Sequence, residues 1–192
     1  WFALFWKKWG RKKDPAPLAE EAEKERTPEI LIEIVDTPEK FRSIAQELVP
    51  SLVELLRSLS ALEGETFRRS QALKRAREAR GERHVSQEEQ ELWTQYKDAY
   101  GRMLEDRCTQ ALLDRGYAGS FGDPTVYGYL DTGCRLTFSM KSSARAVVET
   151  TFPHGVEMCR QFVLRNTEEG WRVDRVSYGF TSEPKKWHIF HI

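Results

Sequence analysis

The chain has 192 residues, which suits one domain of ordinary size with a tail, and such a domain can be stable without disulfides or metal ions. Lysine and arginine together number 30, as do aspartate and glutamate, so the net charge is zero. That balance argues against a dedicated nucleic-acid binder, because such proteins usually carry an excess of basic residues. The three cysteines are odd in number and far apart, which favours a reducing compartment over a disulfide framework.

The first 13 residues combine aromatic and basic side chains. Apolar residues come first and basic residues follow, which is the order typical of the cytoplasmic end of a membrane-spanning helix. A segment this short cannot span a bilayer, which takes about 20 apolar residues. Two interpretations stay open: a membrane-proximal segment, or an amphipathic helix that docks on a protein surface. The residues concerned are Trp1, Phe2, Phe5, Trp6, Lys7, Lys8, Trp9, Arg11, Lys12 and Lys13.

Residues 14–36 form the next segment, which we expect to be a linker. Its first part, to residue 29, is rich in proline, alanine and charge and cannot bury a face. Residues 30–35 are a short apolar run that fits either a strand or the approach to a helix. The folded domain is expected over residues 37–192.

A helix is predicted to begin at residues 37–39. Thr37 is placed to cap it, and Pro38 fits its first position. Apolar residues continue at helical spacing as far as Leu59. Pro50 falls inside this pattern and predicts a kink or a break near residue 49.

Residues 63–85 are rich in charge. They fit a solvated helical excursion between two core helices, or a basic patch for nucleic acid or acidic lipid. The sequence favours the excursion, because no aromatic side chains are interleaved for stacking on bases.

A second helix is predicted to begin at Ser86, which forms a capping-box pattern with Glu89. Apolar residues from Leu92 to Leu112 follow at helical spacing and predict one amphipathic helix more than five turns long. Gly116 is suited to the left-handed position that ends it. A loop is expected at residues 118–125.

Four strands are predicted in the last third of the chain. Short connections between them indicate antiparallel neighbours, and a change in alternation near Arg175 predicts a bulge. In the third strand Arg160 shares a face with the apolar Met158 and Phe162. The expected fold class is α+β, with N-terminal helices packed on an antiparallel sheet of about four strands. The strands are expected over residues 135–141, 144–152, 156–165 and 171–180.

The third and fourth predicted strands carry a resemblance to a known fold. Residues 161–165 and 169–174, with their Gly-Trp-x-Val-Asp ending, resemble the last hairpin of nuclear transport factor 2-like proteins. That resemblance implies a cone of helices against a strongly curved antiparallel sheet. Residues 178–180, Lys186 and Trp187 are further similar to bacterial immunity proteins of this fold, which neutralise Rhs-type and other polymorphic toxins. The resemblance covers residues 37–192, but segments 1–13 and 63–85 depart from the pattern.

The resemblance implies a non-catalytic protein that binds a cognate toxin, without cofactor, metal or nucleic acid. It implies work in the cytoplasm. The aromatic and basic residues 1–13, which are outside the resemblance, separately leave open a tether to the inner membrane through this segment or one that precedes it. The interface would use exposed aromatic and charged side chains of the sheet and its edges. The residues that we expect in it are Tyr178, Trp187, Arg172, Glu157 and Glu149.

Two alternatives stay open beside toxin binding. Residues 1–13 and the linker also fit a membrane-tethered assembly or adaptor module of a secretion or translocation system. A small-molecule enzyme would instead use the cone pocket, with Asp131, His154 and Asp174 as candidates for acid–base work. Turn positions explain the first two of these residues more simply, and a salt bridge explains Asp174.

Other reactive side chains give weak signals. His188 and His191 have no third ligand nearby, so no metal site is expected. Cys134 and Cys159 fall in predicted strands and are expected to be small buried residues rather than nucleophiles.

Overall fold

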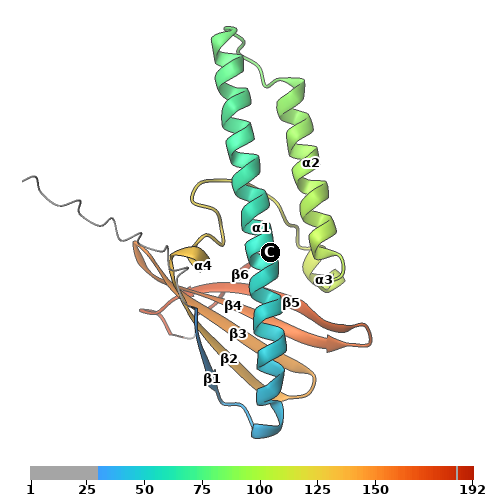
Figure 1. Ribbon diagram of the computed structural model, residues 1–192, viewed down its shortest axis with the longest axis vertical. Coiled ribbons are helices and arrows are strands. Elements are labelled where there is room, and N and C mark those ends of the chain that lie inside the picture. The colour runs from blue at the N-terminus through green and yellow to red at the C-terminus, as the bar shows by residue number, and fades with distance from the viewer. Residues whose placement is uncertain (1–29, 185) are drawn as a thin grey trace, which may run out of the picture.

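The computed structural model describes residues 30–184 and 186–192. The aromatic and basic residues 1–13 and the first part of the expected linker lie outside the described residues. One long helix crosses one side of a six-stranded sheet, and a second helix runs back beside its upper half (Figure 1). The elements are β1 (Leu31–Val35), α1 (Glu39–Ala79), α2 (Gln87–Leu104), α3 (Gln110–Leu113), α4 (Tyr129–Thr132), β2 (Arg135–Ser142), β3 (Arg145–His154), β4 (Val156–Thr167), β5 (Gly170–Phe180) and β6 (His188–Phe190).

The strands lie in the sheet in chain order, from β1 to β6. The four predicted strands are confirmed as the antiparallel meander β2–β5. The expected number of about four strands is too low, because β1 pairs parallel to β2 and β6 pairs antiparallel to β5. The α+β class is confirmed, and the sheet is mixed rather than wholly antiparallel. β1 falls inside the segment expected as a linker.

The core lies between α1 and the sheet. Alternate residues of β2 and β3 point toward the helix and are buried, while their neighbours along each strand are partly exposed. Leu56 and Leu59 of α1 are almost fully buried, as are Phe138 and Phe162 of the sheet. Burial of such side chains contributes about 1.5–3 kcal/mol each.

The turn before α1 differs from the predicted cap. The N-cap residue is Pro38, and the Thr37 side chain makes no capping bond. The Thr37 hydroxyl instead donates to the Val35 carbonyl at 2.7 Å and accepts from the Met140 amide at 3.0 Å. Thr37 therefore joins the end of β1 to β2.

Pro50 does not break α1, which is continuous from Glu39 to Ala79. The predicted split near residue 49 is wrong. Proline removes one helical hydrogen bond, to the carbonyl four residues earlier. That residue is Gln46, and both Gln46 and Pro50 are exposed, so water can bind the unpaired carbonyl.

The single helix predicted through Leu92 and Leu112 is also wrong, because α2 ends at Leu104 and α3 begins at Gln110. Between them the chain pairs with the edge of β5. The Thr109 amide donates to the Val173 carbonyl at 2.9 Å, and the Val173 amide donates to the Arg107 carbonyl at 2.8 Å. These two bonds replace helical ones and pull the backbone out of the helix.

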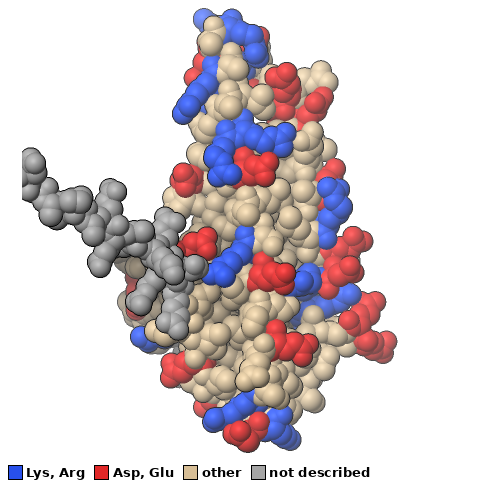
Figure 2. All heavy atoms as spheres, viewed as in Figure 1, with Lys and Arg blue, Asp and Glu red and all other residues tan. Residues whose placement is uncertain are grey.

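The charged segment 63–85 is helical as far as Ala79, as the excursion predicts. The ends of α1 and α2 extend beyond the sheet as a helical hairpin, on which basic and acidic groups are mixed (Figures 1 and 2). Arg77 forms an ion pair with Glu89 across the hairpin at 3.0 Å. Glu89 also completes the predicted capping box with Ser86, which is confirmed.

The predicted bulge is confirmed in β5. Val163 of β4 faces Arg175, whereas the next residue, Leu164, faces Val173. Asp174 is therefore the extra residue. It shifts the alternation so that Val173 and Val176, which are both buried, point toward the helices together.

Replacing Pro50 by alanine tests how much this proline costs the stability of α1. Pro50→Ala restores an amide donor in the middle of α1, so we expect the free energy of unfolding to rise by about 1–3 kcal/mol. Pro38→Ala is the matched control. Pro38 is the N-cap, where an amide donor has no helical acceptor, so its loss should lower stability by about 0.4–1 kcal/mol through the freer unfolded chain. Urea denaturation measures both. If Pro50→Ala were less stable than the wild type, the missing hydrogen bond to the Gln46 carbonyl could not be the main effect of Pro50 on α1.

Candidate functional site

Arg160 lies on the side of the sheet that faces α1, although its neighbours there are apolar. It stands in β4 between Met158 and Phe162, and its register partners are Thr150 of β3 and Tyr178 of β5. The position predicted from the strand pattern is confirmed. A cation on the core side of a sheet requires compensation, because burial disfavours the charged form.

Four aromatic rings supply part of that compensation. The carbon at the centre of the Arg160 guanidinium lies 5.1 Å from the Tyr127 ring centroid, 5.6 Å from Tyr129, 5.7 Å from Phe152 and 5.0 Å from Phe190. Tyr129 and Phe152 also stack on each other, with centroids 3.7 Å apart. The negative faces of such rings attract a cation within about 6 Å.

The hydrogen-bonding capacity of Arg160 is largely unused. Its Nε and Nη1 atoms are buried and have no hydrogen-bond partner within the described residues. No aspartate or glutamate of the described ranges forms an ion pair with it. The Tyr127 hydroxyl is likewise buried without a partner, whereas the Tyr129 hydroxyl accepts from Thr150 at 3.1 Å. Burial raises the pKa of Tyr129 to about 12, so this phenol is neutral and does not offset the guanidinium charge.

Glu63 holds the loop that brings two of the rings to Arg160. Its carboxylate accepts from the Gly122 amide at 3.1 Å and from the Val126 amide at 2.9 Å. Glu63 is 3% exposed, and this burial raises the pKa of its carboxyl. The two amide bonds and the charge of Arg160 lower that pKa, but they do not outweigh the effect of burial.

A cavity of about 600 Å³ opens beside Arg160, between the loop after Gly122 and the hairpin of β3 and β4. Arg160 is the cation among the residues that line it. Two exposed ionisable side chains, Asp123 and His154, also line this cavity. Its remaining wall is mainly apolar and includes Pro124, Tyr129, Phe152, Pro153 and Met158.

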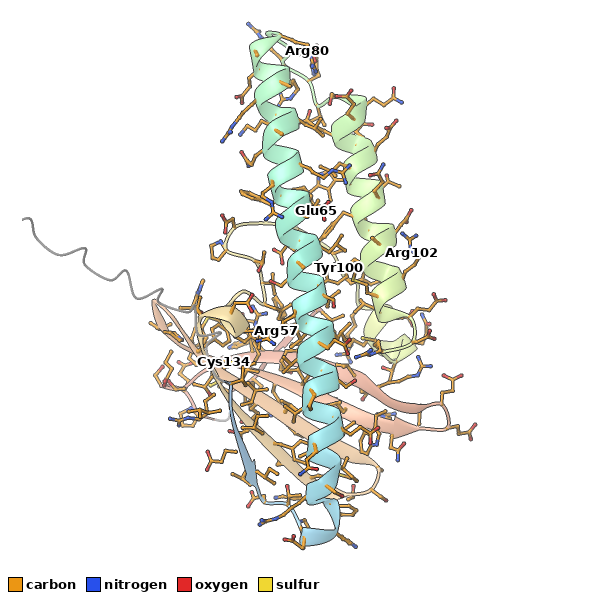
Figure 3. All side chains as sticks on the ribbon, viewed as in Figure 1. Arg57, Glu65, Arg80, Tyr100, Arg102 and Cys134 are labelled. Carbon is orange, nitrogen blue, oxygen red and sulfur yellow. The ribbon has the colours of Figure 1, made fainter. Side chains whose placement is uncertain are left out.

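A second cavity, of about 460 Å³, lies on the other side of the same loop. Arg57 and Arg68 of α1 line it, together with Asp131 of α4. Arg57 lies between α1 and α4 (Figure 3) and approaches Asp131 at 3.5 Å, so one of the two arginines already has a counter-ion. Asp123 lines both cavities.

The opposite side of the sheet is not covered by any helix of the described residues (Figure 1). Its centre combines the apolar register pair Val147 and Val163 with polar side chains, and the Gln161 amide donates there to Glu149 at 2.8 Å. Basic side chains surround that centre and outnumber the acidic ones. We call this side the open face. Its basic residues are Arg135, Lys141, Arg145, Arg165 and Arg175, as the alternation of β2–β5 places them.

The five residues expected in a partner interface do not form one patch. Glu149 lies on the open face, and Trp187 covers the backbone of Gly179 on the same side. Glu157 is exposed beside the turn between β3 and β4. Tyr178 points to the opposite side, where its ring stacks on His188 with centroids 5.1 Å apart.

Arg172 has a different position from the one expected of an interface residue. Its side chain is 15% exposed and pairs with Glu169 at 2.6 Å. It also donates to the carbonyls of Glu105 and Cys108, at 2.8 and 3.3 Å. Arg172 therefore fixes the connection between α2 and α3 to β5.

The three acid–base candidates are dispersed. Asp174 accepts from the Thr109 hydroxyl at 3.0 Å and pairs with Arg165 at 3.0 Å. His154 is exposed at the end of β3, and Asp131 lies in α4. The structure thus brings no two of them into mutual hydrogen bonding within the described ranges.

The remaining reactive side chains lie in packed surroundings. Burial raises the pKa of Cys134 to about 11, so its thiol stays protonated at neutral pH. Cys134 is buried just before β2 rather than within it, and Cys159 is half-buried in β4. His188 and His191 stack on Tyr178 and Phe190 respectively.

Comparison with known protein families, with curated proteins and with solved structures found no match to this chain. Within residues 30–184 and 186–192, none of the helices combines the length and the apolar composition that crossing a membrane requires. The function is therefore argued from the residues themselves.

Sequence reasoning missed Glu63 and the aromatic surroundings of Arg160. Glu63 continues the buried stripe of Leu56 and Leu59 at helical spacing, so its position was the available signal. Arg160 was recognised on an apolar face, but nothing local indicated the rings around it. Three of the four rings, those of Tyr127, Tyr129 and Phe190, are distant from Arg160 in the chain.

Replacing Glu63 by glutamine tests the buried carboxylate through pH. Because its pKa is raised in the folded state, the folded protein binds a proton there more readily than the unfolded chain, whose carboxyl has a pKa near 4.5. Between these two pKa values, stability increases as the pH falls. Glu63→Gln lacks this contribution, so the stability of the wild type should rise relative to the variant as the pH falls toward about 5.

Urea denaturation at several pH values measures this difference. Glu65→Gln is the matched control, since Glu65 is exposed on the same helix (Figure 3), and its curve should run parallel to that of the wild type. If the wild type instead lost stability relative to Glu63→Gln on acidification, the account of Glu63 would be wrong.

Proposed function

We propose that this chain is a bacterial immunity protein of the nuclear transport factor 2-like fold, which binds and neutralises a cognate polymorphic toxin without catalysis. The resemblance of residues 161–174 and of the chain end supports this proposal. The α+β arrangement, in which helices cover one side of a sheet, is compatible with the cone that the resemblance implies. In this proposal the protein works in the cytoplasm, where its three free cysteines stay reduced.

The observation that carries the proposal is the open face of the sheet. Four strands present it without a covering helix among the described residues. Its centre holds the polar pair Glu149 and Gln161 beside the apolar pair Val147 and Val163, and basic side chains surround that centre. Arg145 and Arg165 face each other in the register of β3 and β4, which is unfavourable unless an anion compensates. Asp174 pairs with Arg165 only, and Arg145 forms no ion pair within the described ranges.

The charge of the open face favours an acidic toxin surface as its partner. Opposite charges across an interface accelerate association and select the correct partner. Arg175 is the best single residue for testing this idea, because it is exposed and lies opposite Val163 on the open face.

The proposal is tested with the toxin encoded beside this chain. Co-expression of the wild-type protein should protect cells from the toxin, and the two purified proteins should form a complex. We expect Arg175→Glu to weaken that complex by about 10- to 100-fold, because reversing a charge at the interface replaces attraction with repulsion. Isothermal titration calorimetry measures the dissociation constants.

Arg102→Glu is the matched control, since it makes the same charge change on an exposed face of α2 (Figure 3). It should bind the toxin as the wild type does. Loss of binding in Arg102→Glu with full binding in Arg175→Glu would move the interface to the helices. A wild-type protein that neither protects cells nor binds the toxin would refute the immunity role.

A further inference from the structure

We infer that the cavity beside Arg160 binds a free organic acid, with the carboxylate on the guanidinium and the apolar body against the rings of Tyr129 and Phe152. This site lies on the helix-facing side of the sheet, whereas the open face is on the other side. The inference therefore does not depend on toxin binding.

The first support is a cation that lacks an anion. The Arg160 guanidinium has five N–H donors, and its buried Nε and Nη1 atoms have no acceptor within the described ranges. The four rings attract its charge, but they do not satisfy N–H groups as an oxygen acceptor does. A planar guanidinium matches a carboxylate with two parallel hydrogen bonds.

The nearest buried acid is already engaged elsewhere. The two carboxylate oxygens of Glu63 accept from the amides of Gly122 and Val126 respectively. Moving that carboxylate to Arg160 would leave both amides without their partner, at a cost of about 1–3 kcal/mol each. Glu63 therefore makes the electrostatic potential at Arg160 more negative, but it does not form an ion pair with Arg160.

The walls of the cavity select the kind of acid. Pro124, Phe152 and Met158 offer apolar contact, which suits an aromatic or aliphatic body. The cavity volume of about 600 Å³ is within the usual range for small-molecule sites.

The charged residues that line the cavity favour a ligand with a single negative charge. Phosphate sites usually present several backbone amides or more than one cation, whereas Arg160 is the sole lysine or arginine among the lining residues. Asp123 also lines the cavity and repels a ligand with a second negative charge. A carboxylate with an uncharged body satisfies both conditions.

Indole-3-acetate is a suitable probe, because it joins one carboxylate to a flat apolar ring system. Its neutral isostere, indole-3-acetamide, has the same shape without the charge. The full chain, labelled with ¹⁵N, is titrated with each compound, and the backbone and arginine side-chain signals are followed by NMR.

We expect saturable shifts of the Arg160 Nε–H signal and of the amides around Tyr129 and Phe152, with a dissociation constant below about 1 mM. The amide should bind at least about 10-fold more weakly. Inorganic phosphate at the same concentration should leave these signals in place.

Arg160→Met should abolish the response to indole-3-acetate. It should still fold, because replacing an unpaired buried cation by an apolar side chain of similar length is often neutral or stabilising. Arg160→Lys is the second variant: it keeps the charge but loses the paired donors, and should bind about 10-fold more weakly. Arg68→Met, which removes an arginine from the other cavity, should bind as the wild type does.

Three results would overturn the inference. The first is an absence of shifts at Arg160 and the cavity residues in the folded wild type. The second is equal binding of acid and amide, which would leave the guanidinium without a role. The third is undiminished binding by both Arg160→Met and Arg160→Lys, or by Arg160→Lys alone if the methionine variant does not fold.

Discussion

A buried carboxylate in the middle of α1 is the contact on which the upper half of the domain depends. Glu63 accepts two amide hydrogen bonds from one loop, and that loop continues directly into Tyr127 and α4. The hydroxyls of Ser60 and Thr125 also join this loop to α1, while the loop's own residues make few regular backbone bonds. Two of the four rings around Arg160, those of Tyr127 and Tyr129, follow directly on this loop, and the loop also forms one wall of the neighbouring cavity. Burying the Glu63 carboxylate costs desolvation free energy, and its hydrogen bonds to the loop offset part of that cost.

The features that could be predicted from the sequence are those that depend on residues close together in the chain. The four meander strands and the capping box of Ser86 depend on patterns of a few residues, and both were predicted correctly. The helix predicted through Leu112 failed because its carbonyl and amide groups near Arg107 bond to Val173, a residue far along the chain. Pro50 was overestimated for a related reason: the exposure of the freed carbonyl decides its cost, and exposure follows from tertiary packing.

The candidate site shows the same difference between local patterns, which the sequence reveals, and long-range contacts, which it does not. Alternation along β4 placed Arg160 on the apolar face, yet no local rule shows that Phe190 and Tyr127 enclose it. Arg172 is expected in a partner interface as a charged side chain of the sheet. Its side chain instead bonds to carbonyls between α2 and α3, a contact that becomes visible only when the helices and the sheet are assembled. The open face therefore follows from the strand pattern, whereas the cavity beside Arg160 also needs a loop that only the assembled fold brings to it.

The parallel pairing of β1 with β2 has a consequence for synthesis of the protein on the ribosome. The hydroxyl of Thr37 accepts from the Met140 amide across a separation of 103 residues in the chain. At about 5–20 residues per second, β1 therefore waits roughly 5–20 s for its partner strand to be made. Leu31 and Ile32 are exposed even in the finished sheet, so during this interval the strand presents both an unpaired edge and apolar side chains. The nascent chain is thus most open to mispairing or to capture by a chaperone before β2 emerges.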